Sequence, residues 1–278
     1  MTIAKLVAPV VKWVGGKRQI VEQIKEHLPK TIATYYEPFV GGGAVLFELQ
    51  PPKAVVNDIN KELINLYEVI KNDVEMLIAD LKKHKNEAKY FYEIRGWDRD
   101  SVRYSQLTPL QKASRIIYLN KTCYNGLFRV NKAGEFNTPF GRYTNPNIVN
   151  EPTLKAVSEY FNKADITFTC KDFEEAVTGA KKGDLVYFDP PYDPVSDTAS
   201  FTGYAKNGFN KAEQIRLKKV CDRLNEAGVK FLLSNSATDF IKELYKDYPM
   251  VTIKAKRSIN SDAKKRGEID EVLVMNFE

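Results

Sequence analysis

The sequence predicts an α/β fold in which a parallel sheet is flanked by helices and interrupted by an inserted, mainly helical segment. Three observations predict this fold class. Residues 185–188 form an apolar, β-prone run that indicates a buried strand and ends at an acid and two prolines. Residues 35–40 lead into the glycine turn 41–43 and then a helix pattern, as at the start of a nucleotide-binding sheet. Residues 61–149 contain no further site of this kind and separate the two parts.

Residues 189–192, Asp-Pro-Pro-Tyr, form the corner on which the functional hypothesis rests. Two prolines cannot continue a strand, so the chain turns here and places Asp189 and Tyr192 at the carboxyl end of the strand, where open α/β sheets bind ligands. Asp189 and the carbonyl of Pro190 are two acceptors, and Tyr192 offers a flat face. Together they suit a planar ring that bears an exocyclic NH2 group. The alternative is a rigid loop, since Pro-Pro is common in turns.

The first part of the chain contains candidates for a cofactor pocket. The glycines at 41–43 let the backbone approach a ligand closely. Asp58 ends the second predicted strand, where an acid commonly binds ribose hydroxyls. Together with Asn57, it could equally cap the next helix. Lys17 follows a Gly-Gly pair at a helix start, where it is either an anion ligand or an ordinary solvated side chain.

The inserted stretch changes character along its length. Residues 61–119 show mostly helical patterns, whereas residues 120–144 interleave four bases and one acid with aromatic and amide side chains. Asn125-Gly126 and residues 132–134 are turn signals. Arg and Asn side chains read guanine and adenine edges, and Tyr and Leu can wedge into a base stack. The segment is therefore a candidate DNA-recognition hairpin; an ordinary charged surface hairpin would have the same pattern.

The α/β pattern returns after residue 150. A strand at 166–170 leads to Asp172 and Phe173, which could contact an adenine ring or cap the next helix. Asn210 is the expected N-cap of a long amphipathic helix. A polar loop at 193–208 suits a mobile lid. A strand is predicted at 230–235, a helix at 239–245, and β-like runs at 250–253 and 271–277. The basic loop at 254–266, between the two β-like runs, is either a phosphate contact or a solvated loop.

Composition limits the class of protein. The 278 residues include 43% hydrophobic and 28% charged residues and carry a net charge of +6, which permits a polyanionic partner without requiring one. Three scattered cysteines and two histidines predict neither a metal site nor a disulfide framework, which suits the reducing cytoplasm. No apolar run of 18 residues is present, so we expect no membrane span.

The motifs together resemble one family, the Dam-type DNA adenine-N6 methyltransferases of class D12 (alpha group), and most closely the DpnM kind. The likeness covers nearly the whole chain. Its motifs are Lys12-Trp13-x-Gly15-Gly16-Lys17, Glu37-Pro38-Phe39-Val40-Gly41-x-Gly43, Asn57-Asp58-Ile59-Asn60, Tyr124-Asn125-Gly126-Leu127-x-Arg129, Glu135-Phe136-Asn137-x-Pro139-Phe140-Gly141-Arg142-Tyr143 and Asp189-Pro190-Pro191-Tyr192.

The resemblance implies a Rossmann-like enzyme that transfers a methyl group from S-adenosylmethionine to N6 of adenine in double-stranded DNA, within GATC, after base flipping. It implies a catalytic domain of residues 1–60 and 150–278 and a target-recognition domain of residues 61–149. The catalytic residues would be Asp189, Pro190, Pro191 and Tyr192. The cofactor residues would be Trp13, Lys17, Glu37, Pro38, Phe39, Gly41, Gly43, Asp58, Asp172, Phe173 and Asp189. The DNA-recognition residues would be Lys12, Tyr124, Asn125, Leu127, Arg129, Pro139, Arg142 and Tyr143.

The expected partners are duplex DNA and, in a restriction-modification system, a cognate restriction endonuclease; neither a membrane nor a metal ion is expected, and the chain would be a monomer or a weak dimer. Two alternatives stay open at this level. The acceptor could be another planar amine, such as cytosine N4 or an RNA adenine, because the corner alone does not distinguish them. The chain could also be an inactive DNA-binding relative, against which the intact Asp189 and glycine turn argue.

Overall fold

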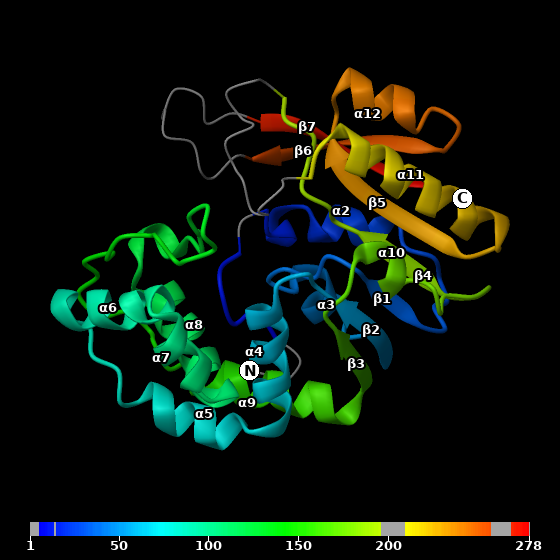
Figure 1. Cartoon of the computed structure of the whole chain (residues 1–278). Helices are drawn as coiled ribbons and strands as arrows, with labels where there is room; N and C mark the ends of the chain where they lie inside the picture. The colour runs from blue at the N-terminus through cyan, green and yellow to red at the C-terminus, as the bar shows by residue number, and fades with distance from the viewer. Residues whose placement is uncertain (1–5, 14, 196–208, 257–267, 278) are drawn as a thin grey trace. The chain divides into compact units, whose positions relative to one another are not determined.

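The computed structural model describes residues 6–13, 15–195, 209–256 and 268–277 (Figure 1). The chain divides into two compact units. The helical unit comprises residues 1–16, 41–52 and 58–170, and the sheet unit comprises residues 17–40, 53–57 and 171–278. The predicted lid and the predicted basic loop fall mostly on residues 196–208 and 257–267, which lie outside the described residues.

The strands of the described chain form one seven-stranded sheet in the order β3-β2-β1-β4-β5-β7-β6. Their bounds are β1 (Tyr35–Glu37), β2 (Lys53–Asn57), β3 (Asp165–Thr169), β4 (Leu185–Phe188), β5 (Lys230–Ser236), β6 (Met250–Lys256) and β7 (Glu268–Met275). β1 pairs in parallel with β2 and β4, and β4 with β5, whereas β7 runs antiparallel to β5 and β6. The strand order reverses between β1 and β4, and the carboxyl ends at such a switch point are where α/β sheets bind ligands.

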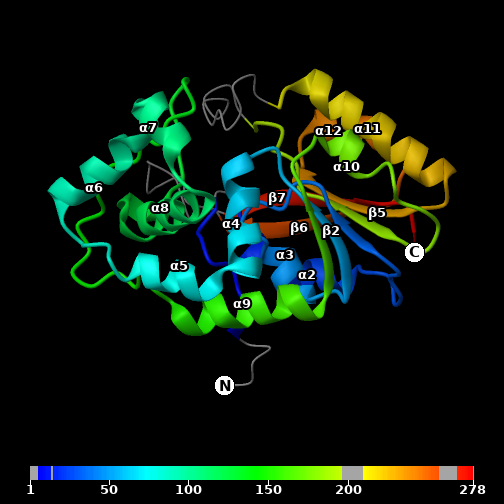
Figure 2. The ribbon, with the colours of Figure 1, turned by 60° about the horizontal axis from the view of Figure 1, so that its bottom comes forward.

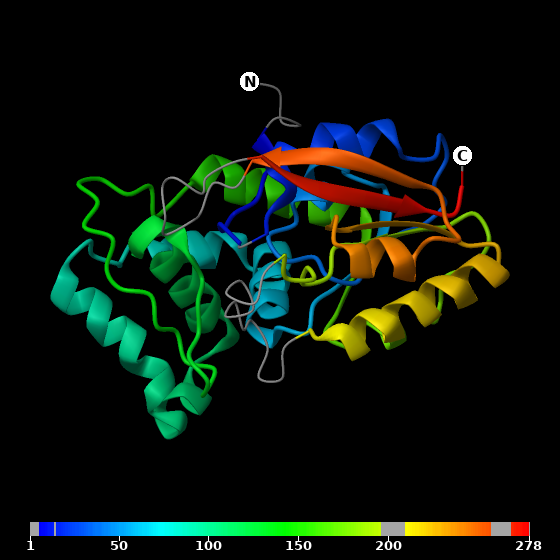
Figure 3. The ribbon, with the colours of Figure 1, turned by 90° about the horizontal axis from the view of Figure 1, so that it is seen from above.

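The two faces of the sheet unit carry alternate residues of each strand. One face packs apolar side chains of β1, β4, β5 and β7 against α10 (Phe173–Ala176), α11 (Lys211–Glu226) and α12 (Asp239–Leu244). Figures 2 and 3 show α11 and α12 on this face and α2 (Val21–Glu26) on the opposite one. Strand register therefore places a second set on the α2 face: Glu37 of β1, Tyr187 of β4, Ser234 of β5 and Glu271 of β7.

Local capping explains where the helices of the sheet unit begin. The side chains of Asp172, Asn210 and Thr238 accept backbone N–H groups at the first turns of α10, α11 and α12. The predicted cap at Asn210 is thereby confirmed. The 3-10 helix η1 (Lys17–Gln19) directly precedes α2, so Lys17 lies on the element that covers the α2 face.

The helical unit is built around α8 (Pro109–Thr122), which packs against α4 (Lys61–Asn72), α5 (Val74–Leu81) and α6 (Ala88–Arg95). α9 (Glu151–Lys163) packs on α4 and α5, as Figure 2 shows. α8 begins with a capping box between Thr108 and Gln111 and has proline at its first position. The remaining elements are α3 (Ala44–Leu49), η2 (Gly96–Arg99), α7 (Ser101–Gln106) and η3 (Tyr124–Gly126).

The predicted hairpin at 120–144 is mostly irregular backbone. It contains two isolated antiparallel bridges, Cys123 with Phe140 and Val130 with Phe136, rather than regular strands. Both turn signals form turns: Asn125-Gly126 lies in η3, and the chain reverses at residues 131–135, where the Gly134 N–H donates to the carbonyl of Asn131 (2.9 Å). Side chains of η2 and α6 take part of the backbone bonding of this segment.

The predicted α/β class, a largely parallel sheet with helices, is confirmed. The proposed division by function, with residues 61–149 as the recognition domain, follows different boundaries from the two compact units and stays a prediction. Among the described residues no helix has the length and apolar character needed to cross a membrane. In the same part of the chain no three His, Cys, Asp or Glu side chains converge as metal ligands would.

Candidate active site and nucleic-acid interface

The corner after β4 belongs to the sheet unit and presents a fixed carboxylate. All four residues of β4 are buried between β1 and β5, so the carboxyl end of the strand cannot shift. Asp189 follows directly and is 19% exposed, and its Oδ1 lies 2.7 Å from Nζ of Lys17. Ser234 of β5 donates to the same oxygen (3.2 Å) and is 3.1 Å from the hydroxyl of the buried Tyr187. One carboxylate oxygen is thus held from two elements.

The electrostatics of Asp189 reflect this burial. Loss of solvent raises the pKa of the Asp189 carboxyl above its ordinary value, while the charge of Lys17 and the hydrogen bonds from Lys17 and Ser234 oppose the rise. Lys17 and Ser234 therefore stabilise the ionised form of this carboxyl against the cost of its burial. A shifted carboxylate that faces a specific cation at a strand end is a typical feature of a functional site.

Tyr192 is held at its hydroxyl and at one ring face. Its hydroxyl donates to Oε2 of Glu271 on β7 (2.8 Å), and Nζ of Lys17 lies 4.3 Å from the ring centroid. Lys17 therefore contacts both Asp189 and Tyr192, the two side chains that the sequence predicts as a slot for a planar amine. Asp189 and Tyr192 are close in sequence, which is why they are predicted to lie together. Their shared contact with Lys17 holds the ring beside the carboxylate.

The backbone of the corner is fixed by a buried polar network. The side chain of Gln214 donates to the carbonyl of Pro191 (2.9 Å), and the N–H of Asp193 donates to Oδ1 of Asn235 (3.0 Å). Asn235 in turn donates to Gln214 (3.1 Å), and Thr238 donates to the carboxylate of Asp193 (2.7 Å). Gln214 and Asn235 are fully buried, and buried polar groups satisfied in this way make the turn rigid.

Other predicted cofactor residues of the sheet unit gather at the ends of β1 and β2. The ring of Phe39 lies 5.4 Å from that of Phe173. The buried side chain of Asn57 donates to the carbonyl of Pro38 (3.0 Å) and bonds both backbone groups of Lys171 (2.8 and 3.0 Å). Asn57 therefore ties together the loops that carry Pro38, Phe39 and Phe173. Glu37 is buried and accepts from the hydroxyl of Tyr35 (2.9 Å).

The carboxylate of Asp172 caps a helix and pairs with an arginine in the described chain. It accepts the N–H of Glu174 as the cap of α10 (3.0 Å), and its Oδ2 lies 2.6 Å from Nη2 of Arg216. The guanidinium of Arg216 also covers the ring of Phe173, 4.2 Å from its centroid. Of the two roles that the sequence left open for Asp172, the structure shows the cap; contact with an adenine ring stays a prediction.

The glycine turn and Asp58 meet within the helical unit. The N–H of Gly41 donates to Oδ2 of Asp58 (3.0 Å), and the hydroxyl of Tyr67 donates to the carbonyl of Gly41 (2.6 Å). Asn60, not Asp58, caps α4. Burial raises the pKa of Asp58 above its ordinary value despite the backbone N–H groups that it accepts. Because Asn60 occupies the cap position of α4, the alternative that Asp58 serves as the helix cap is excluded.

The glycines of this turn are required by protein packing as well as by any ligand. Gly41 and Gly43 have positive φ angles of 47° and 70°, which L side chains rarely adopt. An added Cβ would lie 2.9 Å from Cδ1 of Trp13 at Gly41 and 2.8 Å from Cε2 of Phe47 at Gly43. Trp13 also stacks on Phe128 with ring centroids 4.7 Å apart. The indole thus connects the glycine turn with the predicted recognition segment.

Asn120 joins two predicted DNA-recognition segments of the helical unit. Its side chain accepts from the N–H of Lys12 and donates to the carbonyl of Lys12 (2.8 Å each), and it also donates to the carbonyl of Gly126 (3.0 Å). Gly126 has a φ of 65°, and a Cβ there would lie 2.7 Å from Cδ of Lys12. The structure therefore brings Lys12 beside the turn that presents the exposed Tyr124 and Asn125.

The remaining recognition candidates lie on the irregular segment. Arg129 is exposed, and its Nε donates to Oδ1 of Asn137 (2.8 Å), while the N–H of Asn137 donates to the carbonyl of Arg129 (2.9 Å). Pro139, Arg142 and Tyr143 are exposed, and Leu127 is partly buried.

A buried ion pair supports this segment from behind. Nη2 of Arg115, which is 4% exposed, lies 2.8 Å from Oδ2 of Asp98, and the same oxygen accepts the N–H of Phe136 (2.7 Å). Arg99 and Arg95 donate to the carbonyls of Phe136 (3.2 Å) and Thr138 (3.3 Å). Side chains thus replace the ladder of a regular sheet.

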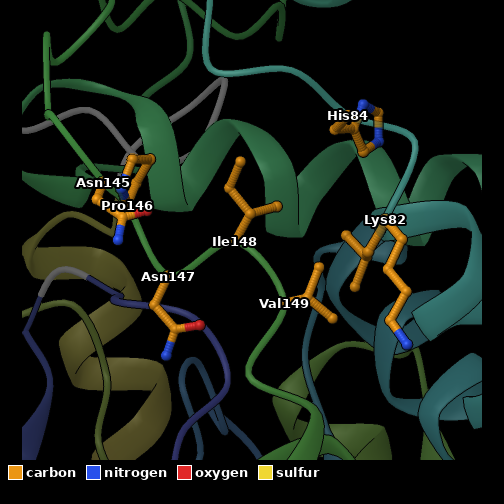
Figure 4. A pocket seen from close by; sticks show the side chains of 8 residues that line it. Lys82, His84, Asn145, Pro146, Asn147, Ile148 and Val149 are labelled. Carbon is orange, nitrogen blue, oxygen red and sulfur yellow. The ribbon is translucent and has the colours of Figure 1, made fainter.

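The helical unit also contains a cavity of about 390 Å³ between the end of α5 and residues 145–149 (Figure 4). Lys82 and His84 contribute to its lining. His84 is hydrogen-bonded by Tyr90 (2.9 Å) and Ser114 (3.0 Å), and burial lowers its pKa to about 4, so its ring is neutral at pH 7. None of the predicted site residues lines this cavity.

Sequence patterns missed several residues that hold the site. Ser234, Glu271, Gln214 and Asn235 are distant in sequence from the corner that they fix, and no local motif marks them. Asn57 lies within one of the family motifs and Asn120 begins the segment 120–144, and the structure shows that both side chains are buried. Ile59, directly after Asp58, is a large apolar side chain that is 69% exposed.

The sheet order and the Asp-Pro-Pro-Tyr corner at its switch point define the chain as a Rossmann-like methyltransferase. More specifically, residues 13–259 match the model of the D12 class N6 adenine-specific DNA methyltransferases, and the chain belongs to that family. It is 43% identical over 271 residues to the type II methyltransferase M1.LlaDCHI of Lactococcus lactis subsp. cremoris, covering 97% of this chain and 95% of that protein. It is 43% identical to the type II methyltransferase M.MjaIII of Methanocaldococcus jannaschii (98% and 99% covered) and 35% identical to the DNA adenine methylase of Escherichia coli K12 (95% and 94% covered). The chain is therefore an enzyme that methylates adenine in DNA.

Proposed function

We propose that the enzyme transfers the methyl group of S-adenosylmethionine to N6 of the adenine in GATC of double-stranded DNA, and that the adenine leaves the helix to react. The observation that carries this proposal is the corner of the sheet unit, where Lys17 and Ser234 both hold Oδ1 of Asp189, and Lys17 also contacts the ring of Tyr192. Within the described residues these two contacts leave Oδ2 of Asp189 as the acceptor that we assign to the adenine amine. The amino group of a paired adenine is buried in the duplex, so an enzyme that acts on it must extrude the base.

The chemistry follows from what the corner can do to an adenine amine. The N6 lone pair is delocalised into the ring, and hydrogen bonds from its two hydrogens to Asp189 and to the Pro190 carbonyl would favour a pyramidal, more nucleophilic nitrogen. Tyr192 would stack on the base. Because Lys17 covers one face of the Tyr192 ring, the base takes the other face or displaces the lysine. S-adenosylmethionine supplies a methyl group on a sulfonium, and the acceleration comes mostly from positioning.

The residues present suit such a cofactor. A carboxylate has about four acceptor sites, so the two backbone N–H groups on Asp58 leave it able to bind hydroxyls. The turn beside it has an exposed apolar neighbour, Ile59, and a tryptophan ring. We assign cofactor binding to Trp13, Gly41, Gly43 and Asp58 in the helical unit and, as separate assignments, to Lys17, Glu37, Pro38, Phe39, Asp172, Phe173 and Asp189 in the sheet unit.

DNA binding is assigned to the exposed residues of the helical unit. Arg129 offers a guanidinium fork, the commonest reader of guanine edges, and Tyr124 is an exposed ring of the kind that enters a base stack. Lys12, Asn125, Leu127, Pro139, Arg142 and Tyr143 complete the proposed interface. The likeness to Dam-type enzymes supports GATC as the site, with residues 61–149 as the main recognition domain.

The biological setting is part of the same proposal. Two of the similar proteins are named type II methyltransferases, which supports a restriction endonuclease of the same specificity as a partner. One palindromic site can be methylated one strand at a time, so we propose a monomer or weak dimer. A cytoplasmic location follows from the DNA substrate.

The test is a methyl-transfer assay with labelled S-adenosylmethionine and duplex oligonucleotides. The set contains GATC, its one-base variants and a GATC duplex in which the adenine is already N6-methylated on both strands. We expect incorporation only with unmethylated or half-methylated GATC, and N6-methyladenine as the only methylated nucleoside after digestion. Equal incorporation into the one-base variants would refute the site, and N4-methylcytosine would refute the acceptor.

A further inference from the structure

The hydroxyl of Tyr192 has a partner that the proposed chemistry does not use. It donates to Oε2 of Glu271 at 2.8 Å, although stacking on a base needs only the ring. Lys17 lies over the ring, and the residues on either side of Tyr192 are fixed through Gln214 and Asn235. Tyr192 is therefore constrained in three places: the face of its ring, its hydroxyl, and the backbone on either side of it.

Glu271 is a rigid point of attachment because of its place in the sheet. It lies on β7, between β5 and β6, paired with Ser236 on one side and Ile253 on the other. The residues that follow it, Val272 and Leu273, are fully buried. The backbone from which its carboxylate extends is thus held by strands on both sides rather than by a loop.

The face on which Glu271 lies links it to the corner. Its side chain projects to the same face as Ser234, since Glu271 and Leu273 are alternate residues and Leu273 pairs with Ser234. Glu271 and Ser234 therefore act from one face on the two side chains of the corner, the first on Tyr192 and the second on Asp189. The neighbouring acid of β7, Asp270, is exposed and has the opposite orientation.

The hydroxyl of Tyr192 stays a hydrogen-bond donor at neutral pH. Burial, and then the charges of Asp189 and Glu271, raise the pKa of Tyr192 well above its ordinary value, so the phenol keeps its proton and remains a donor. A hydrogen bond from a neutral donor to a carboxylate is stronger than one between neutral groups.

We infer that Glu271 is a positioning residue for the methyl-transfer step: by holding the hydroxyl of Tyr192 it sets the plane of the ring, and with it the place of the stacked base relative to Asp189. This inference rests on the proposed role of Tyr192 as the stacking surface. If the Tyr192 ring were free to rotate about its side-chain bonds, it would still bind the base. The amine of the base would then lie beside Asp189 for a smaller share of the time.

The test is a double-mutant cycle of Tyr192→Phe and Glu271→Ala. Tyr192→Phe keeps the ring and removes only the hydroxyl. Single-turnover methylation of the duplex is measured at saturating cofactor, together with the KM for DNA, the KM for cofactor and the unfolding midpoint. We expect each single variant to lose about 10-fold in the single-turnover rate, the factor expected for one hydrogen bond to a charged acceptor, with both KM values within about twofold. The double variant should lose no more than the stronger single variant, because both remove the same bond.

Two controls separate positioning from structure. Tyr248 donates to Asp222 (2.6 Å) elsewhere in the sheet unit, so Tyr248→Phe removes the same kind of bond and should lower the unfolding midpoint without changing the rate. Asp270→Ala removes the exposed neighbouring acid of β7 and should also leave the rate unchanged. If Glu271→Ala is too unstable to assay, Glu271→Gln keeps the volume and an acceptor oxygen, and an intermediate loss of about threefold is expected.

Losses that multiply in the double variant, or a Glu271→Ala rate within twofold of the parent enzyme, would overturn the inference while the parent enzyme still methylates adenine. Failure of the parent enzyme to methylate DNA would instead count against the proposed function, so the two failures are distinguishable.

Discussion

The corner after β4 and the irregular segment 123–143 are fixed in opposite ways. The corner follows a fully buried strand, and the carboxylate of Asp189 and the ring of Tyr192 are held by side chains from β5, β7 and η1. The irregular segment has no regular strand, and its backbone is held by the side chains of Arg95, Asp98 and Arg99, while most of the side chains that we assign to DNA recognition are exposed.

The difference teaches what each kind of chemistry requires. Methyl transfer to a weak nucleophile depends on placing groups to a fraction of an ångström, and sheet register provides that precision. Reading a DNA site requires exposed side chains on a backbone that can follow the groove, and a segment held by a few side-chain bonds provides that freedom. We therefore expect variants of the corner to change the rate and variants of the irregular segment to change the choice of sequence.

The largest effect is expected at the corner itself. Asp189→Ala removes the acceptor for the adenine amine and should lower the single-turnover rate by roughly 10³-fold, as the loss of a preorganised catalytic contact does. Affinity for GATC duplex, measured by fluorescence anisotropy, should remain within about threefold because the DNA residues are assigned to the other unit. Asp247→Ala, which removes an exposed acid of the same unit, serves as the control. Activity near that of the parent enzyme would exclude Asp189 from the reaction.

Substitutions in the irregular segment should change the rate on GATC less, and should change the discrimination between DNA sequences strongly. Arg129→Ala should reduce discrimination between GATC and its one-base variants by about 10- to 100-fold, the range for one bidentate base contact, and weaken non-specific binding little. Asn137→Ala should cause part of the same loss, because Asn137 orients the guanidinium of Arg129.

The matched control for Asn137→Ala is Asn147→Ala, an exposed asparagine outside the segment. The measurement is the ratio of kcat/KM for GATC to that for each variant duplex. Unchanged ratios in Arg129→Ala would contradict base reading by this residue.

The smallest effect is a shift in pH dependence. The hydrogen bond from Ser234 is one of the contacts that oppose the raised pKa of Asp189, so Ser234→Ala should raise that pKa further. The protonated carboxyl no longer accepts strongly from the amine, so the rate falls as the pH falls through this pKa, and the acid limb of the single-turnover rate should move to higher pH. At the optimum we expect a loss of about fivefold.

Ser158→Ala, at a buried serine of the helical unit, should leave the pH profile unchanged. An acid limb that stays in place in Ser234→Ala would show that Ser234 does not act on Asp189.

The sequence by itself determined the class of the sheet and the position of the corner, and it predicted the residues that we assign to the chemistry. Those features are local: a buried strand that meets two prolines must turn, and a left-handed turn between a strand and a helix selects glycine, as at Gly41 and Gly43. Resemblance of the motifs was sufficient to predict the family.

Only the tertiary structure decided what holds those residues in place. That the Trp13 ring packs against Gly41 and that Glu271 holds Tyr192 depends on residues far apart in sequence. Pattern and propensity describe the neighbours of a residue along the chain. Hydrogen bonds across a sheet depend on which strands are adjacent and in which register they pair, and that is settled when the whole core packs.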